Sequence, residues 1–342
     1  MNFTSAFQAA MKRQDNKGRC LHFEDDVRCN EIISAHSIQK KGQLHSIAES
    51  GHVYRLNADL STLTENGGKP QLKKVGLNRA STFPGMCKYH DNKLFAPIDD
   101  RKLSFDLEQI GLYAYRSICR EYFVKENASI TSAKMSEHPG LSAQGLMALQ
   151  ICAYGQSLGF ERLKRHKHIY DVALASGAFT GFKFMSFEST SRCSVQASGL
   201  LFPDFDFQGG LLQDLALFKE PMDLLTFFTA PTEKGWAFVF AWHESSDRAC
   251  RQLMYSLAKS GGEGAQLPDI LLRFCLMCCE NHAIRISWWD GLPFSEKARA
   301  LELMAYMGDT SEGVRSNYLV AGYEGLADWS FDYVKDRMSD RM

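Results

Sequence analysis

Three cysteines and one histidine in the first hundred residues constrain this chain more than any other feature. Cys20, Cys29, Cys87 and His90 supply three thiolates and one imidazole, the donor set that suits tetrahedral structural zinc. The two residues between Cys87 and His90 let both side chains of a tight turn reach one ion, and Cys20 and Cys29 enclose a longer knuckle. Because this region is short of large apolar side chains, core burial alone stabilises it poorly. We therefore predict a zinc site here, with three unrelated free thiols as the alternative.

The composition is that of a globular protein, and five further cysteines are predicted to be reduced and packed in its core. Apolar residues make up 45% of the 342 residues and the net charge is −1, so a sizeable core is available and the overall charge indicates no partner. The sequence shows neither an apolar leader nor a run of 18 apolar residues, so we expect a cytoplasmic protein without a membrane partner. Without export, disulfides are not expected. Five cysteines lie in apolar helical stretches and are predicted to pack there: Cys119, Cys152, Cys275, Cys278 and Cys279.

The pattern of apolar residues predicts an α+β protein of two domains. Residues 1–100 are expected to form the zinc-binding module, with strands over 51–56 and 73–77. Residues 101–342 are expected to form a larger α+β domain, in which a mainly antiparallel sheet is flanked by helices. The strands of this domain are predicted over 181–187, 193–202, 224–230 and 235–242, because these runs are short, rich in aromatic and β-branched residues, and bounded by turn residues. Helices are predicted over 107–126, 246–259, 268–283 and 294–307, and 141–176 is predicted to form either one long helix or two consecutive helices.

The residues around the ligand pairs follow an order found in a known family. After the first knuckle comes the strand-like run 32–36, Ile-Ile-Ser-Ala-His, and directly after His90 come Asp91 and Asn92. This order resembles the HNH, or ββα-metal, nuclease finger. That finger is a treble-clef arrangement in which a zinc knuckle precedes a strand ending in Asp-His, and a metal-binding His follows the second knuckle. The resemblance covers residues 19–95. The segments AHSIQ, GHVY and TFPGMCKYHDN also resemble a family of bacterial proteins, a likeness that implies no activity.

The HNH resemblance implies a metal-dependent nucleic-acid endonuclease that hydrolyses phosphodiester bonds, in a context of bacterial defence. His36 falls where the family keeps its general base, and Asp91, with Asn92, falls where it keeps a ligand for a catalytic Mg²⁺ or Mn²⁺. A neutral imidazole suits deprotonation of water, and oxygen donors suit a hard divalent ion. Three positions depart from the family pattern: Ala35 replaces Asp, Thr82 stands near the expected Asn, and Asp91 replaces His.

These departures leave a second class of function open. A finger that keeps its zinc without the catalytic residues is a non-catalytic adaptor that binds nucleic acid or a protein. In that case His36 is a replacement zinc ligand or a buried histidine that orients the knuckle. His45 and His52 are nearby histidines expected at the surface or in hydrogen bonds, with His52 the better outside candidate for a ligand.

Basic side chains near the finger predict contacts with a phosphate backbone, with DNA favoured over RNA; an ordinary solvated surface is the alternative. The predicted contact residues are Lys40, Lys41, Lys73, Lys74, Arg79 and Lys88. A denser basic run at 162–168 is either a second contact or the polar face of a helix.

The larger domain is expected to regulate the finger or recognise its target, through a protein partner or a second copy of the chain. The sequence lacks the phosphate-binding, dinucleotide-binding and hydrolase motifs that would indicate an ATPase, a dehydrogenase or an α/β-hydrolase. The run Glu280-Asn281-His282 carries no recognisable chemistry, and Trp288 and Trp289 are expected to pack in the core.

Overall fold

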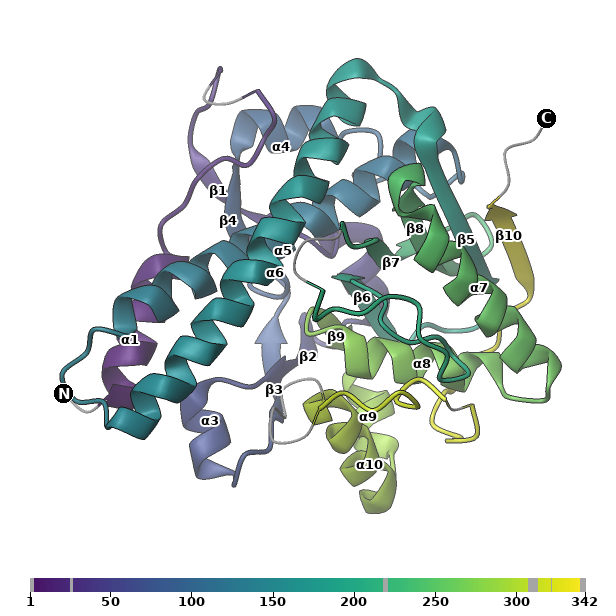
Figure 1. The fold of residues 1–342 in the computed structure, drawn as a ribbon. Coiled ribbons are helices and arrows are strands. Elements are labelled where there is room, and N and C mark those ends of the chain that lie inside the picture. Colours follow the sequence, from purple (N-terminus) through teal and green to yellow (C-terminus); the bar gives the residue numbers. More distant parts are fainter. Residues whose placement is uncertain (1–2, 25–26, 218–220, 307–312, 321, 339–342) are drawn as a thin grey trace.

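Two antiparallel sheets organise the chain in the computed structural model, which describes residues 3–24, 27–217, 221–306, 313–320 and 322–338 (Figure 1). The smaller sheet pairs β1 (Ile32–His36) with β4 (Thr82–Cys87). The larger has eight strands in the order β10-β5-β8-β7-β6-β9-β2-β3. Its strands are β2 (His52–Asn57), β3 (Gln71–Gly76), β5 (Phe182–Ser189), β6 (Val195–Leu201), β7 (Leu225–Pro231), β8 (Trp236–His243), β9 (His282–Ile284) and β10 (Tyr333–Arg337). Every pairing is antiparallel, which confirms the predicted sheet.

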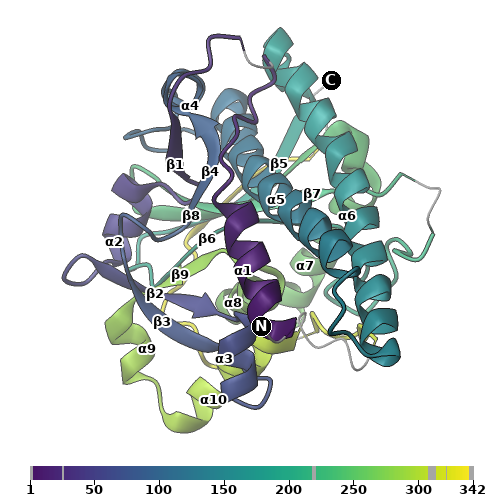
Figure 2. The same ribbon diagram turned by 90° about the vertical axis from the view of Figure 1, so that its left-hand side faces the viewer.

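Helices cover both faces of the larger sheet, which confirms the expectation of a sheet flanked by helices (Figures 1 and 2). On β8, Phe238, Phe240 and Trp242 belong to the core on the side of α8, whereas the small residues between them belong to the core on the side of α5. Burial on both faces explains why these strands read as continuous apolar runs. The helices are α1 (Phe3–Asp15), α2 (His45–Ile47), α3 (Leu60–Glu65), α4 (Lys88–Phe95), α5 (Leu107–Met135), α6 (Ala143–Ser176), α7 (Asp247–Gly262), α8 (Leu267–Cys278), α9 (Ile286–Gly291) and α10 (Phe294–Ala305).

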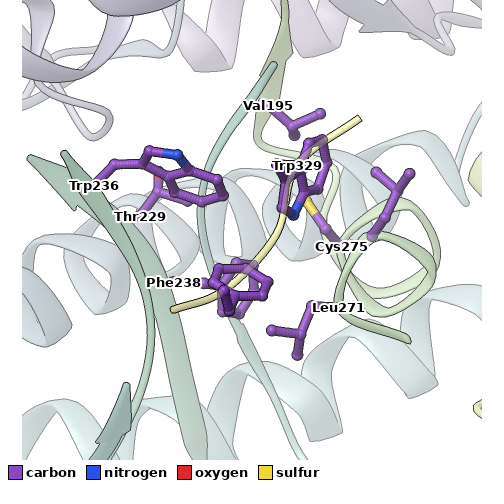
Figure 3. Close-up of a pocket in the computed structure, with 9 residues that line it drawn as sticks. Val195, Thr229, Trp236, Phe238, Leu271, Cys275 and Trp329 are labelled. Carbon is purple, nitrogen blue, oxygen red and sulfur yellow. The ribbon is translucent and has the colours of Figure 1, made fainter. Parts of the chain in front are cut away.

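A void of about 10 Å³ lies in the core between β7, β8 and α8 (Figure 3). Aromatic and aliphatic side chains surround it, including Trp236, Phe238, Leu271 and Trp329. This volume is about the minimum for one water molecule, and the apolar surroundings disfavour a water there. The void is therefore packing space within the core.

The long helices begin and end at residues whose side chains suit those positions. Asp106 precedes α5 and accepts a hydrogen bond from the Gln109 amide at 2.8 Å, and Ser142 does the same for Gly145 at 3.1 Å before α6. Gly177 ends α6 in the left-handed conformation, with φ of 66°. The predicted helix over 107–126 therefore exists but extends to Met135, and the residues predicted over 141–176 form one long helix, α6.

Two later helices end before their predicted last residues. The helix expected over 268–283 ends at Cys278, and residues from His282 form β9 instead, because their backbone pairs with β6 and β2. The helix expected over 294–307 ends at Ala305, and residue 307 lies outside the described residues. Among the described helices, none has a stretch long and apolar enough to cross a bilayer.

The first hundred residues contribute to both sheets. The β2–β3 hairpin joins the larger sheet through β9, where Tyr54 lies opposite Ile284. The predicted domain boundary at residue 100 separates strands that belong to this one sheet, and the division into domains 1–100 and 101–342 stays a prediction.

Asn281 joins the smaller sheet to the larger one. Its side-chain amide donates to the Ser37 hydroxyl at 2.8 Å and to the Ser198 carbonyl oxygen at 2.9 Å. Its amide oxygen accepts from the Ser81 hydroxyl at 2.9 Å. Because Ser37 follows β1 and Ser81 precedes β4, this one buried side chain fixes the smaller sheet against β6.

Candidate metal centre

The four predicted zinc ligands converge on one point. The Cys20 and Cys29 sulfurs each lie 3.5 Å from Nδ1 of His90, and the Cys87 sulfur lies 3.4 Å from it. The four ligand atoms all lie within 4.8 Å of one another. In a tetrahedral site with metal–sulfur bonds of about 2.3 Å and a metal–nitrogen bond of about 2.0 Å, sulfur and nitrogen are about 3.5 Å apart. The observed spacing therefore fits a single ion at the centre.

Hydrogen bonding alone does not account for this arrangement. Nδ1 of an imidazole carries either one proton or one lone pair in the ring plane, so it can form one good hydrogen bond. Three sulfurs around one nitrogen leave at least two thiols without a well-directed partner there. A divalent ion satisfies all four atoms at once, because each ligand then points its lone pair at the centre. The donor set therefore fits a soft or borderline metal such as zinc.

Local backbone structure brings the ligands together. Cys87 is the last residue of β4 and precedes the first turn of α4, where its sulfur accepts a hydrogen bond from the His90 amide at 3.4 Å. Residues 19–21 run beside β4, because the Arg19 and Leu21 amides donate to the Pro84 and Gly85 carbonyls at 3.0 and 2.9 Å. These bonds hold Cys20 beside β4, and its sulfur lies within 4.8 Å of the Cys87 sulfur.

The missing side chain at Gly85 leaves room for the Phe83 ring of the same strand, while the segment 19–21 is at ordinary contact distance. A Cβ atom at Gly85 would lie 2.3 Å from the Phe83 ring and 3.4 Å from the Leu21 side chain. On the far side of the centre, the Asn30 side chain accepts from the Tyr89 amide at 2.9 Å, and the Lys88 amide donates to the Glu31 carbonyl at 2.8 Å. These bonds hold the residues after Cys29 against the start of α4.

Two residues outside the ligand set lie against His90. With Nδ1 facing the centre, Nε2 carries the proton and faces the Glu24 carboxylate at 3.5 Å, without a direct hydrogen bond. A carboxylate on this side of a ligating imidazole favours that tautomer electrostatically. The His22 ring stacks on His90, with centroids 4.0 Å apart and planes 3° from parallel. Burial, together with the neighbouring His90, lowers the pKa of His22 to about 4, so His22 is neutral at pH 7.

Two of the three thiols, those of Cys20 and Cys29, resist ionisation without a cation. At the third, burial is outweighed by hydrogen bonds, among them one from the His90 amide, which lower the pKa of the Cys87 thiol. Burial raises the pKa of the Cys20 thiol. Burial and the neighbouring Cys20 sulfur raise the pKa of the Cys29 thiol to about 12. A metal ion reverses this preference, because it binds the thiolate form and releases the protons.

The residues predicted for catalysis lie outside this cluster. His36 ends β1, and its Nε2 lies 3.0 Å from the Leu77 carbonyl oxygen; burial lowers its pKa. Asp91 lies in the first turn of α4, where partial burial raises the pKa of its carboxyl. Asn92 is exposed. Among the described residues, the groups of side chains close enough to share a metal contain neither His36 nor Asp91.

The predicted nucleic-acid contacts are surface residues. Lys73 and Lys74 lie on the edge strand β3, and Lys41 pairs with Asp100 at 2.6 Å. Lys40 is half-buried, and the others are exposed: Lys41, Lys73, Lys74, Arg79 and Lys88.

Glu24 and His22 are the functional side chains that the sequence analysis did not identify. The pattern His-x-Glu beginning two residues after a ligand cysteine is the available indication, since a ligating histidine needs a partner for its second nitrogen. Comparison of the chain with protein-family models, with curated proteins and with solved structures gives no match.

Proposed function

We propose that residues 19–95 form a zinc-bound treble-clef finger of the ββα-metal type and that the protein binds nucleic acid through it. The observation that carries the proposal is the position of the ligands. Two come from the segment before β1, one ends β4, and one lies in the first turn of α4, the helix that directly follows β4. Strand, strand and helix thus surround one Cys3His cluster, in the order that the resemblance implies. Zinc is the scaffold in this account, because no ligand position is left open for a substrate.

Exposed lysines on β3 and α4 support nucleic acid as the partner. Lys73, Lys74 and Lys88 are exposed, and none of them forms an ion pair within the described part of the chain. Cations of this kind bind phosphate oxygens by releasing counterions, so binding weakens steeply with salt. DNA is the proposed partner.

Charge reversal on β3 tests this proposal. Lys73→Glu/Lys74→Glu is expected to weaken binding to a short DNA duplex at least tenfold, and to lower the slope of log affinity against log salt by about 2. Fluorescence anisotropy across a salt series measures both quantities. The matched control is Lys12→Glu/Arg13→Glu, which reverses two neighbouring exposed charges on α1. Equal affinities for the two double variants would contradict a contact at β3.

Endonuclease activity is a second candidate, favoured by the environment of His36. Because a carbonyl oxygen only accepts, the contact with Leu77 requires a proton on Nε2 of His36. Nδ1 then keeps its lone pair, and the lowered pKa keeps the ring neutral at pH 7. A neutral, oriented imidazole is suited to remove a proton from water. Asp91, helped by Asn92, would hold a Mg²⁺ or Mn²⁺ ion, which neutralises charge on the phosphate.

A nicking assay tests this candidate. With Mg²⁺ or Mn²⁺, the wild-type protein is expected to nick plasmid DNA, and His36→Ala is expected to lower the rate by about 10²–10⁴-fold. Asp91→Asn should lose activity at low Mg²⁺ while keeping its zinc. His45→Ala, at an exposed histidine, serves as the control. If purified wild-type protein never nicks DNA or RNA, catalysis is excluded and the adaptor function gains.

A further inference from the structure

A cleft of about 420 Å³ opens beside the metal centre. One wall is the segment Cys20–Phe23, and the other is the C-terminal half of α6, with Tyr122 of α5 between them. Figure 2 shows the segment that leads from α1 toward β1 running beside this half of α6. The volume lies within the roughly 300–1,000 Å³ of pockets that hold small ligands.

The period of α6 divides its basic run into two faces. Lys164, Lys167 and His168 face the cleft, at the three- and four-residue spacing of one helix face. Arg162 turns away and donates to the Leu215 carbonyl oxygen at 3.0 Å. His166 is buried, with a ring nitrogen 2.7 Å from the Met222 carbonyl oxygen. The basic run is therefore more than a solvated surface, because part of it is directed into a concave site.

Two of the three basic groups at the cleft are free to bind a ligand. The Lys167 ammonium is held by both Asp171 carboxylate oxygens at 2.9 Å and by the Tyr115 hydroxyl at 3.3 Å. Lys164 and His168 are exposed, and neither side chain forms a hydrogen bond or an ion pair with the described residues. The cleft thus presents uncommitted N–H donors beside a neutralised pair.

Aromatic rings form the opposite wall. The Phe23 ring lies 4.0 Å from His22, which stacks on the metal ligand His90. Phe23 is the outermost of these three rings: it is half-buried and lines the cleft. Tyr122, also half-buried, lies at the same cleft. An aromatic platform opposite the free Lys164 ammonium and the His168 ring matches a ligand with a flat base and an anionic group.

We infer that this cleft binds one nucleotide unit of a single-stranded nucleic acid, with the base against Phe23 and the phosphate near Lys164 and His168. The inference rests on the proposed function in taking nucleic acid as the partner, but it uses a different surface from β3. A double helix is too large for the cleft, so only an unpaired nucleotide can enter it. A free mononucleotide offers the same base and phosphate.

Anisotropy titration of the zinc-loaded full chain with a labelled oligothymidine of about ten nucleotides tests the inference. Lys164→Glu is expected to weaken binding about tenfold and to lower the salt slope by about 0.7. Phe23→Ala is expected to weaken it about fivefold or more at constant salt slope, because stacking carries no charge. Arg165→Glu is the matched control, since it reverses an exposed charge on α6 one residue outside the cleft.

The outcomes separate this inference from the proposed function. Equal single-strand affinities for Lys164→Glu and Arg165→Glu would overturn the inference, and duplex binding through Lys73 and Lys74 would then survive alone. If thymidine monophosphate competes with the oligonucleotide, the cleft also accepts free nucleotides. If it does not compete, but Lys164→Glu still weakens binding of the oligonucleotide, the cleft is a site for a strand. If neither single strands nor duplexes bind, both proposals fail together.

Discussion

Cys87→Ser is expected to lose the bound metal and to unfold the segment around α4. Cys87 is fully buried, supplies one of the four candidate ligand atoms, and is the N-cap residue of α4. Structural zinc supplies about 10–16 kcal/mol of binding free energy in small fingers, so losing one of four ligands removes a large share of it. The loss also reaches α5, because Phe83 of β4 packs on Phe123. Thermal unfolding followed by circular dichroism measures the effect, and a chelator should reproduce it in the wild type.

Cys152→Ser is the matched control for this change. Cys152 is exposed on α6, so the prediction that it packs in the core is wrong, and its sulfur only accepts a hydrogen bond from Gln156. This variant should keep both the metal and the unfolding temperature. A Cys87→Ser protein as stable as Cys152→Ser would show that no metal stabilises the fold.

Asn281→Leu is expected to destabilise the protein by about 3–5 kcal/mol, since it leaves several buried polar groups without partners. The groups affected are the hydroxyls of Ser37 and Ser81 and the carbonyl of Ser198. Leucine has as many side-chain heavy atoms as asparagine and a larger volume, so it leaves no cavity, and the loss comes from the missing hydrogen bonds together with the added bulk. Urea unfolding at equilibrium measures the change in the free energy of unfolding.

Asn78→Leu, at an exposed position, is the control for Asn281→Leu and should change stability by less than about 0.5 kcal/mol. A loss below about 1 kcal/mol for Asn281→Leu would contradict the assignment of this residue as the joint between the two sheets.

Strands β5 to β8 of the larger sheet could be predicted from the sequence, because strands buried on both faces consist of nearly continuous apolar residues. The runs at 224–230 and 235–242 are β7 and β8 to within a residue or two. Strand β9 could not be predicted, since its three residues, His282–Ile284, are too few to show an alternating pattern. Only pairing with β6 and β2, distant in the sequence, makes that segment a strand.

The site shows the same division between local and long-range information. Cysteine and histidine are the usual zinc ligands, so the four candidate ligands could be identified from their residue types and their spacing in the sequence. Glu24 and His22 could not, because their roles depend on the ring position of His90. The place of Asn281 and the direction of Lys164 likewise depend on how distant elements pack together.

The central claim is a single metal ion held by Cys20, Cys29, Cys87 and His90. Elemental analysis of the purified protein, combined with X-ray absorption at the zinc edge, tests it most directly. We predict about one zinc per chain, with three sulfurs at about 2.3 Å and one nitrogen at about 2.0 Å. Protein that folds without stoichiometric metal, or whose zinc is bound by oxygen and nitrogen alone, would contradict the account.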